Sequence, residues 1–246
     1  AHVSAAGKDR RMFFSSGRFT QIAPLAADLR KDTRVITFAG PHGLEAGDWI
    51  VIYKPTDYSW HDSRYYYRAG EWCQIASARH RSVKLRAPLR ADYASKDVIP
   101  YQVGLRHPAL SGGNWDCQDQ MLVDYTGCSG PIVNVASVKA RANTVINIDR
   151  CVSARIRCGY GYNDGSGHDD YLIAIGNSQN IHVSGDELFS RRHPVAIGGG
   201  DLVCGVPTRD CRVTDAKLLN QLSTNVMCAD IHGCVQNSGY ENCIIM

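Results

Sequence analysis

The stretch Tyr171-Leu-Ile-Ala-Ile-Gly-Asn-Ser-Gln-Asn-Ile-His-Val decides the fold. It holds two short apolar runs separated by a polar corner, which is the pattern of two strands joined by a tight turn. Two later parts of the chain repeat this pattern: Pro194-Val-Ala-Ile-Gly-Gly with Asp210-Cys-Arg-Val, and Ala229-Asp-Ile-His-Gly-Cys with Asn242-Cys-Ile-Ile. Internal repetition of short strands favours a solenoid of stacked coils over a sandwich or a barrel.

The spacing of the repeats predicts the length of one coil. Ile175 and Ile197 are 22 residues apart, which is close to one coil of a parallel β-helix. Ile197 and Ile231 are 34 residues apart, so we expect an insertion over the glycine-rich residues 198–210. Side chains at equivalent positions of successive coils should stack inside the solenoid. The predicted ladders are Ile175, Ile197 and Ile231, and Ile181, Cys211 and Cys243.

The chain divides into three parts, and the second and third are dominated by β-structure. Residues 1–34 form a small mixed lead-in, where Gln21 to Lys31 suits one short helix. Residues 35–110 form a β-rich leading domain with alternating strands such as Trp49-Ile-Val-Ile-Tyr. Residues 111–246 hold the coils. A loop from Lys54 to Gly70 carries aromatic residues that either stack on sugar rings or cover an apolar edge.

Composition excludes several classes of protein. The 246 residues carry a formal net charge of only +3, which gives no reason to expect nucleic acid or a membrane as a partner. The chain has 10 cysteines, but no pair has the C-x-x-C spacing of a zinc ribbon or a thioredoxin-type site. We expect reduced thiols in the core, and neither a metal nor a cofactor.

Several motifs of the sequence resemble those of a known family. Gly43-Leu-Glu-Ala-Gly-Asp-Trp-Ile-Val-Ile, with Gly70-Glu-Trp-Cys-Gln-Ile-Ala-Ser and Val83-Lys-Leu-Arg-Ala-Pro-Leu, resembles the start of pectate-lyase-like right-handed β-helix proteins. Arg191-Arg-His-Pro-Val-Ala-Ile-Gly-Gly-Gly and Ala229-Asp-Ile-His-Gly resemble motifs of phage tailspikes and capsule depolymerases. The resemblance implies an all-β protein with a right-handed parallel β-helix. It also implies a homotrimer in the virion tail, assembled with other tail proteins, that binds and cleaves a bacterial surface polysaccharide.

The C-terminal residues lead to one further prediction. The chain stops at Ile244-Ile-Met, inside a predicted strand and without a polar cap. The end of a solenoid needs a cover. We therefore expect further coils or a partner to complete it.

Alternation places the candidate catalytic groups. If Ile231 points inward, Asp230 and His232 both point outward, because alternate side chains of a strand share a face. The repeat puts Ala174 and Ala196 at the place of Asp230 on earlier coils, and Gly176 and Gly198 at the place of His232. Asp170 and Arg192 share the outward parity. His193 has inward parity, but Pro194 follows it and can bend the start of the strand, so His193 stays a candidate.

These groups suit several reactions. In glycoside hydrolysis two carboxyl groups share the work, so Asp230 needs a partner among Asp170, Asp169 and Asp201. In a lyase, His232 or His193 removes a proton beside a uronate carboxylate that Arg192 or Arg191 neutralises. Cleavage of a teichoic-acid-type phosphodiester would use the same groups. Hydrolysis is preferred, because two carboxylates are the commonest solution for neutral sugars. We also expect substrate contacts at Arg191, Asp169, Asp201, Tyr162, Trp60 and Tyr66.

Simpler interpretations of the same residues stand beside these. Asp230 suits a turn before a tight corner, Arg191 and Arg192 suit a solvated surface, and His193 suits the core. A non-catalytic adhesin or structural tail component that binds the glycan through its aromatic loop is the corresponding alternative function.

Overall fold

The computed structural model describes residues 11–56, 58, 68–165, 170–199, 204–220 and 228–246. The chain divides into two compact units. The solenoid unit comprises Ala1–Ser16, Arg106–Gly199 and Thr208–Met246, and the leading unit comprises Gly17–Leu105 and Gly200–Pro207. No helix among the described residues is long and apolar enough to span a bilayer. The predicted fold class, an all-β protein with a parallel β-helix, is confirmed.

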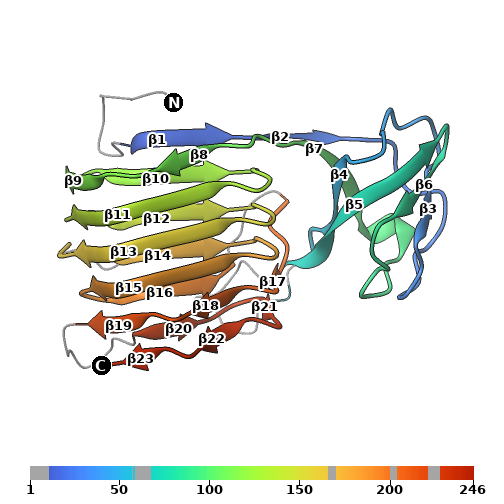
Figure 1. Ribbon diagram of the computed structural model, residues 1–246. Helices are drawn as coiled ribbons and strands as arrows, with labels where there is room; N and C mark the ends of the chain where they lie inside the picture. Colours follow the sequence, from blue (N-terminus) through green and yellow to red (C-terminus); the bar gives the residue numbers. More distant parts are fainter. Residues whose placement is uncertain (1–10, 57, 59–67, 166–169, 200–203, 221–227) are drawn as a thin grey trace. The chain divides into compact units, whose positions relative to one another are not determined.

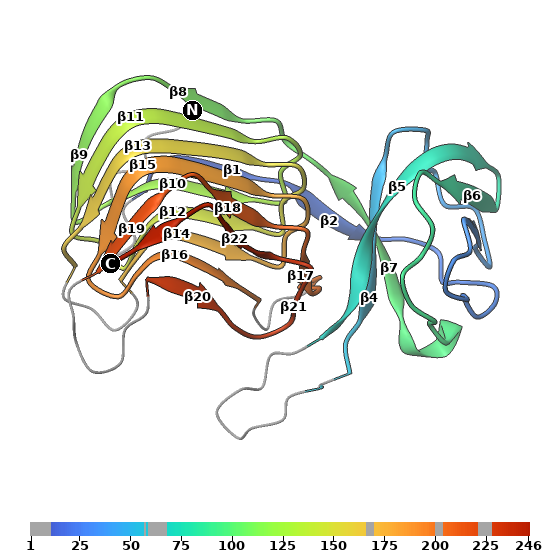
Figure 2. The ribbon, with the colours of Figure 1, turned by 60° about the horizontal axis from the view of Figure 1, so that its bottom comes forward.

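The solenoid unit consists of parallel strands stacked coil upon coil (Figure 1). We call its two main layers sheet 1 and sheet 2; Figure 2 shows them from a second side. The strands of sheet 1, in spatial order, are β1 (Arg11–Ser16), β10 (Met121–Thr126), β12 (Thr144–Asp149), β14 (Tyr171–Gly176), β16 (His193–Gly198) and β20 (Ala229–Ile231). Because β1 pairs with β10, the N-terminal lead-in contributes to the solenoid as well as to the leading unit.

Sheet 2 runs beside sheet 1 and completes each coil. Its strands are β8 (Ala109–Ser111), β9 (Asn114–Gln118), β11 (Ile132–Ala140), β13 (Arg155–Asn163), β15 (His182–Ser190), β18 (Arg212–Thr214), β19 (Lys217–Asn220), β22 (Gly239–Glu241) and β23 (Ile244–Ile245). A short third layer pairs β17 (Thr208–Arg209) with β21 (Val235–Gln236). All of these pairs are parallel, as a solenoid requires.

An apolar ladder fills the interior behind sheet 1. Ile148, Ile175, Ile197 and Ile231 occupy equivalent positions on successive strands. The first three are buried, and Ile231 on the last coil is 44% exposed. The predicted ladder of Ile175, Ile197 and Ile231 is therefore confirmed, and alternation along each strand turns the neighbouring residues outward.

The second predicted ladder is partly wrong. His182 pairs with Arg212 and Arg212 with Gly239, so the residue stacked on Ile181 and Cys211 is Ser238. Cys243 instead precedes Ile244, which pairs with Lys217, and so it lies in the coil position of Ala216. Sheet 2 has two strands per coil at this end, and Cys243 belongs to the second of them, which the spacing of the repeats alone does not distinguish.

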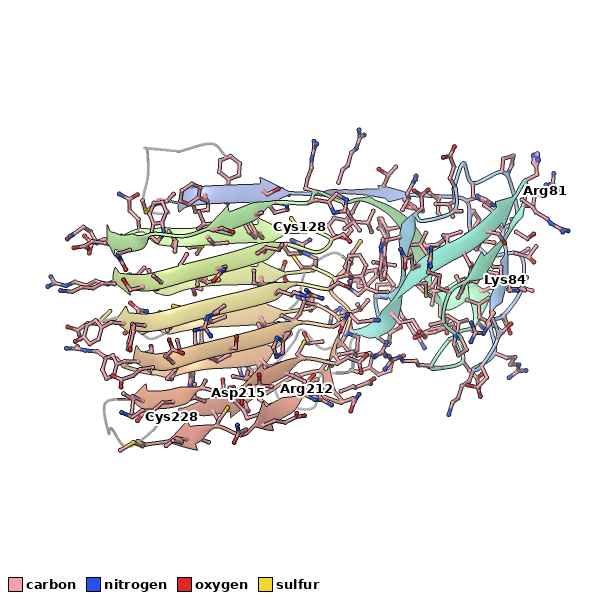
Figure 3. All side chains as sticks on the ribbon, viewed as in Figure 1. Arg81, Lys84, Cys128, Arg212, Asp215 and Cys228 are labelled. Atoms are coloured by element: carbon pink, nitrogen blue, oxygen red, sulfur yellow. The ribbon has the colours of Figure 1, made fainter. Side chains whose placement is uncertain are left out.

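All ten cysteines are free thiols, as expected. Eight are buried, and Cys128 lies at the corner that follows β10 (Figure 3). Burial raises the pKa of Cys117 and of Cys158 to about 12. These side chains act as small core residues with weak donors; the thiol of Cys151, for example, donates to the carbonyl oxygen of Asp149 at 3.2 Å.

The leading unit is an antiparallel sheet. Its order is β2 (Arg18–Gln21), β7 (Ile99–Gly104), β4 (Trp49–Lys54), β5 (Ala69–Arg79), β6 (Ser82–Leu85) and β3 (Val35–Thr37), with one 3₁₀ turn, η1 (Ser95–Asp97). Arg81 and Lys84 mark the β5–β6 hairpin in Figure 3. The core includes Ile36, Phe38, Ile50, Ile52 and Ile75.

The short helix expected over Gln21–Lys31 does not form. Leu25 and Leu29, within this segment, each form an isolated antiparallel bridge, with Phe38 and Tyr93 respectively. Both leucines are buried in the core of the leading unit. Tertiary packing therefore overrides the local preference for a helix.

Candidate active site

Asp230 and His232 lie next to each other at the end of β20. Nδ1 of His232 is 2.7 Å from Oδ2 of Asp230. Because an ionised carboxylate only accepts hydrogen bonds, Nδ1 is the donor in this pair. The Asp230 side chain is 15% exposed and that of His232 is 35% exposed. Ile231 between them continues the interior ladder, so both side chains project from the outer face of sheet 1.

His193 joins this pair from the preceding coil. Its Nε2 atom lies 3.6 Å from Oδ2 of Asp230, and its side chain is 7% exposed. Simple parity gave His193 an inward direction. Its contact with Asp230, which projects from the outer face, shows that alternation does not hold at the start of β16, next to Pro194. The break turns His193 toward Asp230 instead of into the core.

Tyr171 contacts both His193 and Arg192. Its ring stacks on the His193 imidazole, with ring centroids 5.6 Å apart and an angle of 14° between the planes. The guanidinium carbon of Arg192 lies 5.4 Å from the centre of the same ring. The Tyr171 ring thus contacts and orders both side chains. Sequence reasoning missed Tyr171. Its alignment with His193 on the next strand of sheet 1 could have indicated the contact.

The environment keeps Asp230 ionised. Burial by itself raises the pKa of the Asp230 carboxyl. Burial is the largest single effect, but the hydrogen bond from His232 and the positive charges of His232, His193 and Arg192 together outweigh it, so the pKa is lowered below its ordinary value. We call these four residues, with Tyr171, the Asp230 cluster. Asp230 is suited to act as a base or as a support for an imidazolium, but not as a proton donor.

Tyr240 fixes the strand that carries Asp230. Its hydroxyl accepts a hydrogen bond from the backbone amide of Asp230 at 3.0 Å and donates one to the carbonyl of Val195 at 2.8 Å. Tyr240 comes from β22 in sheet 2, so one side chain ties the last two strands of sheet 1 together. Sequence reasoning missed this residue too, because nothing in the local pattern around it indicates a contact with sheet 1.

Small residues lie beside the cluster, as the repeat predicted. Ala174 pairs with Ala196 and Ala196 with Asp230, while Gly176 pairs with Gly198. We call Ala174, Gly176, Ala196 and Gly198 the small-residue floor. A Cβ atom at Gly198 would lie 3.3 Å from Nε2 of His232, so the imidazole rests directly on this glycine.

Other candidate residues lie elsewhere. Asp170 is buried, and its carboxylate lies beside Gly165, while its carbonyl accepts hydrogen bonds from Ser190 and His193. Arg191 forms an exposed ion pair with Asp164 at 2.5 Å.

Tyr162 lies on sheet 2, where it stacks on Phe189 with ring centroids 4.7 Å apart. It is therefore on a different sheet from Asp230. Four further candidates lie outside the described residues: Asp169, Asp201, Trp60 and Tyr66.

Comparison with known families matches both parts of the chain. Residues 139–246 match the family model described as Gp49, pectin lyase-like. Residues 14–102 match the model of a tailspike protein-like, Ig-like domain. A comparison with curated protein sequences gives no match.

Solved structures of phage tailspikes are similar over nearly the whole chain. Tailspike gp49 of Pseudomonas phage LKA1 is 29% identical with a TM-score of 0.84, over 96% of this chain and 40% of that one. Tailspike gp61 of Pseudomonas phage phi297 is 26% identical with a TM-score of 0.80, over 94% and 39%. The Gp54 tailspike of Acinetobacter baumannii bacteriophage AP22, solved with A. baumannii capsular saccharide, is 27% identical with a TM-score of 0.79, over 94% and 39%.

The chain thus spans about two fifths of the length of the tailspikes that it matches. The two family models match different parts of the chain, and the solved tailspikes match its fold. The chain has a parallel β-helix whose residues 139–246 match a pectin lyase-like family model, and as a whole it resembles phage tailspikes.

Proposed function

We propose that this chain is part of a tailspike that binds and depolymerises a bacterial surface polysaccharide, a capsule or an O-antigen, at the Asp230 cluster. The observation that carries the proposal is the contact of Asp230 with two imidazoles on the outer face of sheet 1, beside a floor of small residues. The capsular saccharide bound to the AP22 tailspike supports the substrate class.

His232 is the proposed acid–base group. Its Nδ1 proton is held by Asp230, which leaves Nε2 to exchange a proton with the substrate or with water. The ionised carboxylate stabilises the imidazolium that forms when Nε2 takes up this proton. Arg192, ordered on Tyr171, supplies a positive charge for an anionic group of the glycan.

Glycoside hydrolysis is the preferred reaction. A water molecule attacks the anomeric carbon, its proton passes to the base, and the leaving sugar oxygen receives a proton from an acid. Asp230 and His232 together act as the base that takes up the proton of the attacking water. Asp169 and Asp201 remain the predicted sources of the acid, and the position of Asp170 beside Gly165 argues against it.

A lyase is the second candidate, and the Asp230–His232 pair favours it. A carboxylate-supported imidazole is suited to remove the proton beside a uronate carboxylate, with Arg192 neutralising that carboxylate. The bond to the leaving sugar then breaks with formation of a carbon–carbon double bond. The same groups suit a teichoic-acid-type phosphodiester.

The assembly is also a proposal. We expect a homotrimer that, with other tail proteins, forms part of the virion tail outside the host cell. The tailspike identity of the similar structures supports this location. The mass of the purified chain in solution, measured by light scattering, tests the trimer.

The test is the release of reducing ends from purified capsular polysaccharide, lipopolysaccharide and teichoic acid. The wild type should release reducing ends, and the Asp230→Asn variant should release none. Asp186→Asn, which changes a half-exposed carboxylate on sheet 2, is the matched control and should cleave normally. An absorbance increase from an unsaturated product would assign the lyase reaction. Binding of a glycan without any cleavage would favour the adhesin and overturn the enzyme.

A further inference from the structure

A second polar group lies on the outer face of sheet 1, at the end of β12. Asp149 is 8% exposed, and both of its carboxylate oxygens have partners. Oδ2 accepts a hydrogen bond from Nε of Arg150 at 2.6 Å, and Oδ1 accepts one from Nδ2 of Asn177 at 3.0 Å. Burial raises the pKa of the Asp149 carboxyl, although both partners oppose this effect.

Arg150 occupies a backbone position that suits glycine. The residue after each of the three strands β10, β12 and β14 has a left-handed conformation, with φ of 58° at Gly127, 48° at Arg150 and 50° at Asn177. Glycine adopts this conformation freely and asparagine tolerates it, whereas a long side chain is strained there. The solenoid corner itself therefore gives no reason for an arginine.

The carboxylate of Asp149 is also unnecessary for the coil. Thr126 and Gly176 occupy the same position on the neighbouring strands, and neither carries a charge. A buried carboxylate and a strained arginine in adjacent positions both lower stability. Departures of this kind from local rules are expected at functional sites.

This group lies across two glycines from His232. Oδ1 of Asp149 is 3.3 Å from the Cβ position of Gly176, and Nε2 of His232 is 3.3 Å from that of Gly198. Gly176 and Gly198 are paired on adjacent strands. Such strands are about 4.8 Å apart. The two polar groups therefore border the same pair of glycines from opposite sides.

We propose that Asp149, Arg150 and Asn177 form a sugar-binding subsite that holds the glycan residue next to the bond presented to His232. The inference rests on the proposed function. The Asp149 carboxylate accepts and the Arg150 guanidinium donates, which matches adjacent hydroxyl groups of a sugar ring. The amide of Asn177, which is 3% exposed, holds the carboxylate in place. Asp149 and Arg150 offset each other's charge, so the subsite suits a neutral ring better than a uronate.

The test separates recognition from stability. Arg150→Gly installs the residue found at the equivalent corner after β10 and relieves the strain. The thermal midpoint should stay close to that of wild type, because the relief of strain offsets the loss of the ion pair with Asp149. The Kd for capsular polysaccharide or O-antigen should increase at least tenfold. Gln118→Gly is the matched control, because Gln118 has a φ of 51° and lies at the end of β9 in sheet 2. It should be at least as stable as wild type, because it relieves strain without breaking a buried ion pair, and it should bind as wild type.

Two outcomes would overturn the inference directly, and another would make it depend on a second variant. Unchanged glycan binding by Arg150→Gly would contradict the subsite while leaving the proposed function intact, provided that Asp230→Asn still abolishes cleavage. A lower thermal midpoint together with lost binding would assign Arg150 a structural role. In that case Asp149→Asn, which keeps the shape of the side chain, must also lose binding without loss of stability for the subsite to stand. A wild type that binds no glycan in the panel would overturn the proposed function and the subsite together.

Discussion

The hydroxyl of Tyr240 is hydrogen-bonded to the backbone amide of Asp230. The same hydroxyl donates to the carbonyl of Val195, so a residue from sheet 2 joins β16 and β20 of sheet 1. Since β20 has only three residues and ends the sheet, this contact determines where Asp230 and His232 stand relative to His193.

Tyr240→Phe should therefore weaken both the fold and the activity. The substitution leaves the amide of Asp230 without this partner, which costs about 1–3 kcal/mol in free energy of unfolding. Cleavage of the polysaccharide should fall, because the Asp230–His232 pair loses its support. Urea unfolding and reducing-end release measure the two effects.

The control for Tyr240 is Tyr160→Phe. Tyr160 is 62% exposed on sheet 2, and removal of its hydroxyl should change neither stability nor cleavage. An active Tyr240→Phe variant with wild-type stability would show that the hydroxyl does not position Asp230.

Gly198→Ala should reduce cleavage with little effect on the fold. The added Cβ would lie 3.3 Å from Nε2 of His232, which is closer than ordinary contact, so the imidazole must shift by a few tenths of an ångström. Misplacement of a catalytic group by about 1 Å costs up to about 100-fold in rate. Gly239→Ala on β22 is the matched control, because a Cβ there has nothing within 4 Å. Equal rates for Gly198→Ala and wild type would exclude His232 from the reaction.

Alternation and repetition were enough to predict the coils, but not every side chain within them. Ile175, Ile197 and Ile231 form the expected ladder because the strands of sheet 1 keep their alternation in the middle. Cys243 was misplaced because spacing alone does not show which of two strands in a coil a segment joins.

The candidate site could be predicted where it depends on one strand and not where it depends on several. Asp230 and His232 are two residues apart, and their shared face follows from local geometry. The contact of His193 with Asp230 depends on a break in alternation at the start of β16. Tyr240 reaches Asp230 from another sheet, and no sequence pattern encodes such a contact.

Thiol reactivity should follow burial. Cys234 and Cys243 are partly exposed, and the other eight cysteines are buried. Thiolates are the reactive form, and a pKa of about 12 leaves Cys117 and Cys158 almost entirely protonated at neutral pH. Iodoacetamide should label Cys234 and Cys243 in the native protein, and all ten cysteines after denaturation, as measured by mass spectrometry. Native labelling of Cys117 or Cys158, or a disulfide at either, would contradict the solenoid core.

Acid should destabilise the protein partly through Asp230. The pKa of its carboxyl is lowered in the folded protein from its ordinary value of 3.8, so the group stabilises the fold fully above that value. This stability is lost as the pH falls through the lowered pKa, because protonation then breaks the pairing with His232. We expect the free energy of unfolding of Asp230→Asn to fall less steeply than that of wild type below about pH 4. Urea titrations at a series of pH values measure this slope, with Asp186→Asn as the control for a half-exposed carboxylate. Parallel curves for wild type and Asp230→Asn would show that the imidazoles do not stabilise the charge of Asp230, and the proposed roles of Asp230 and His232 would then fail together.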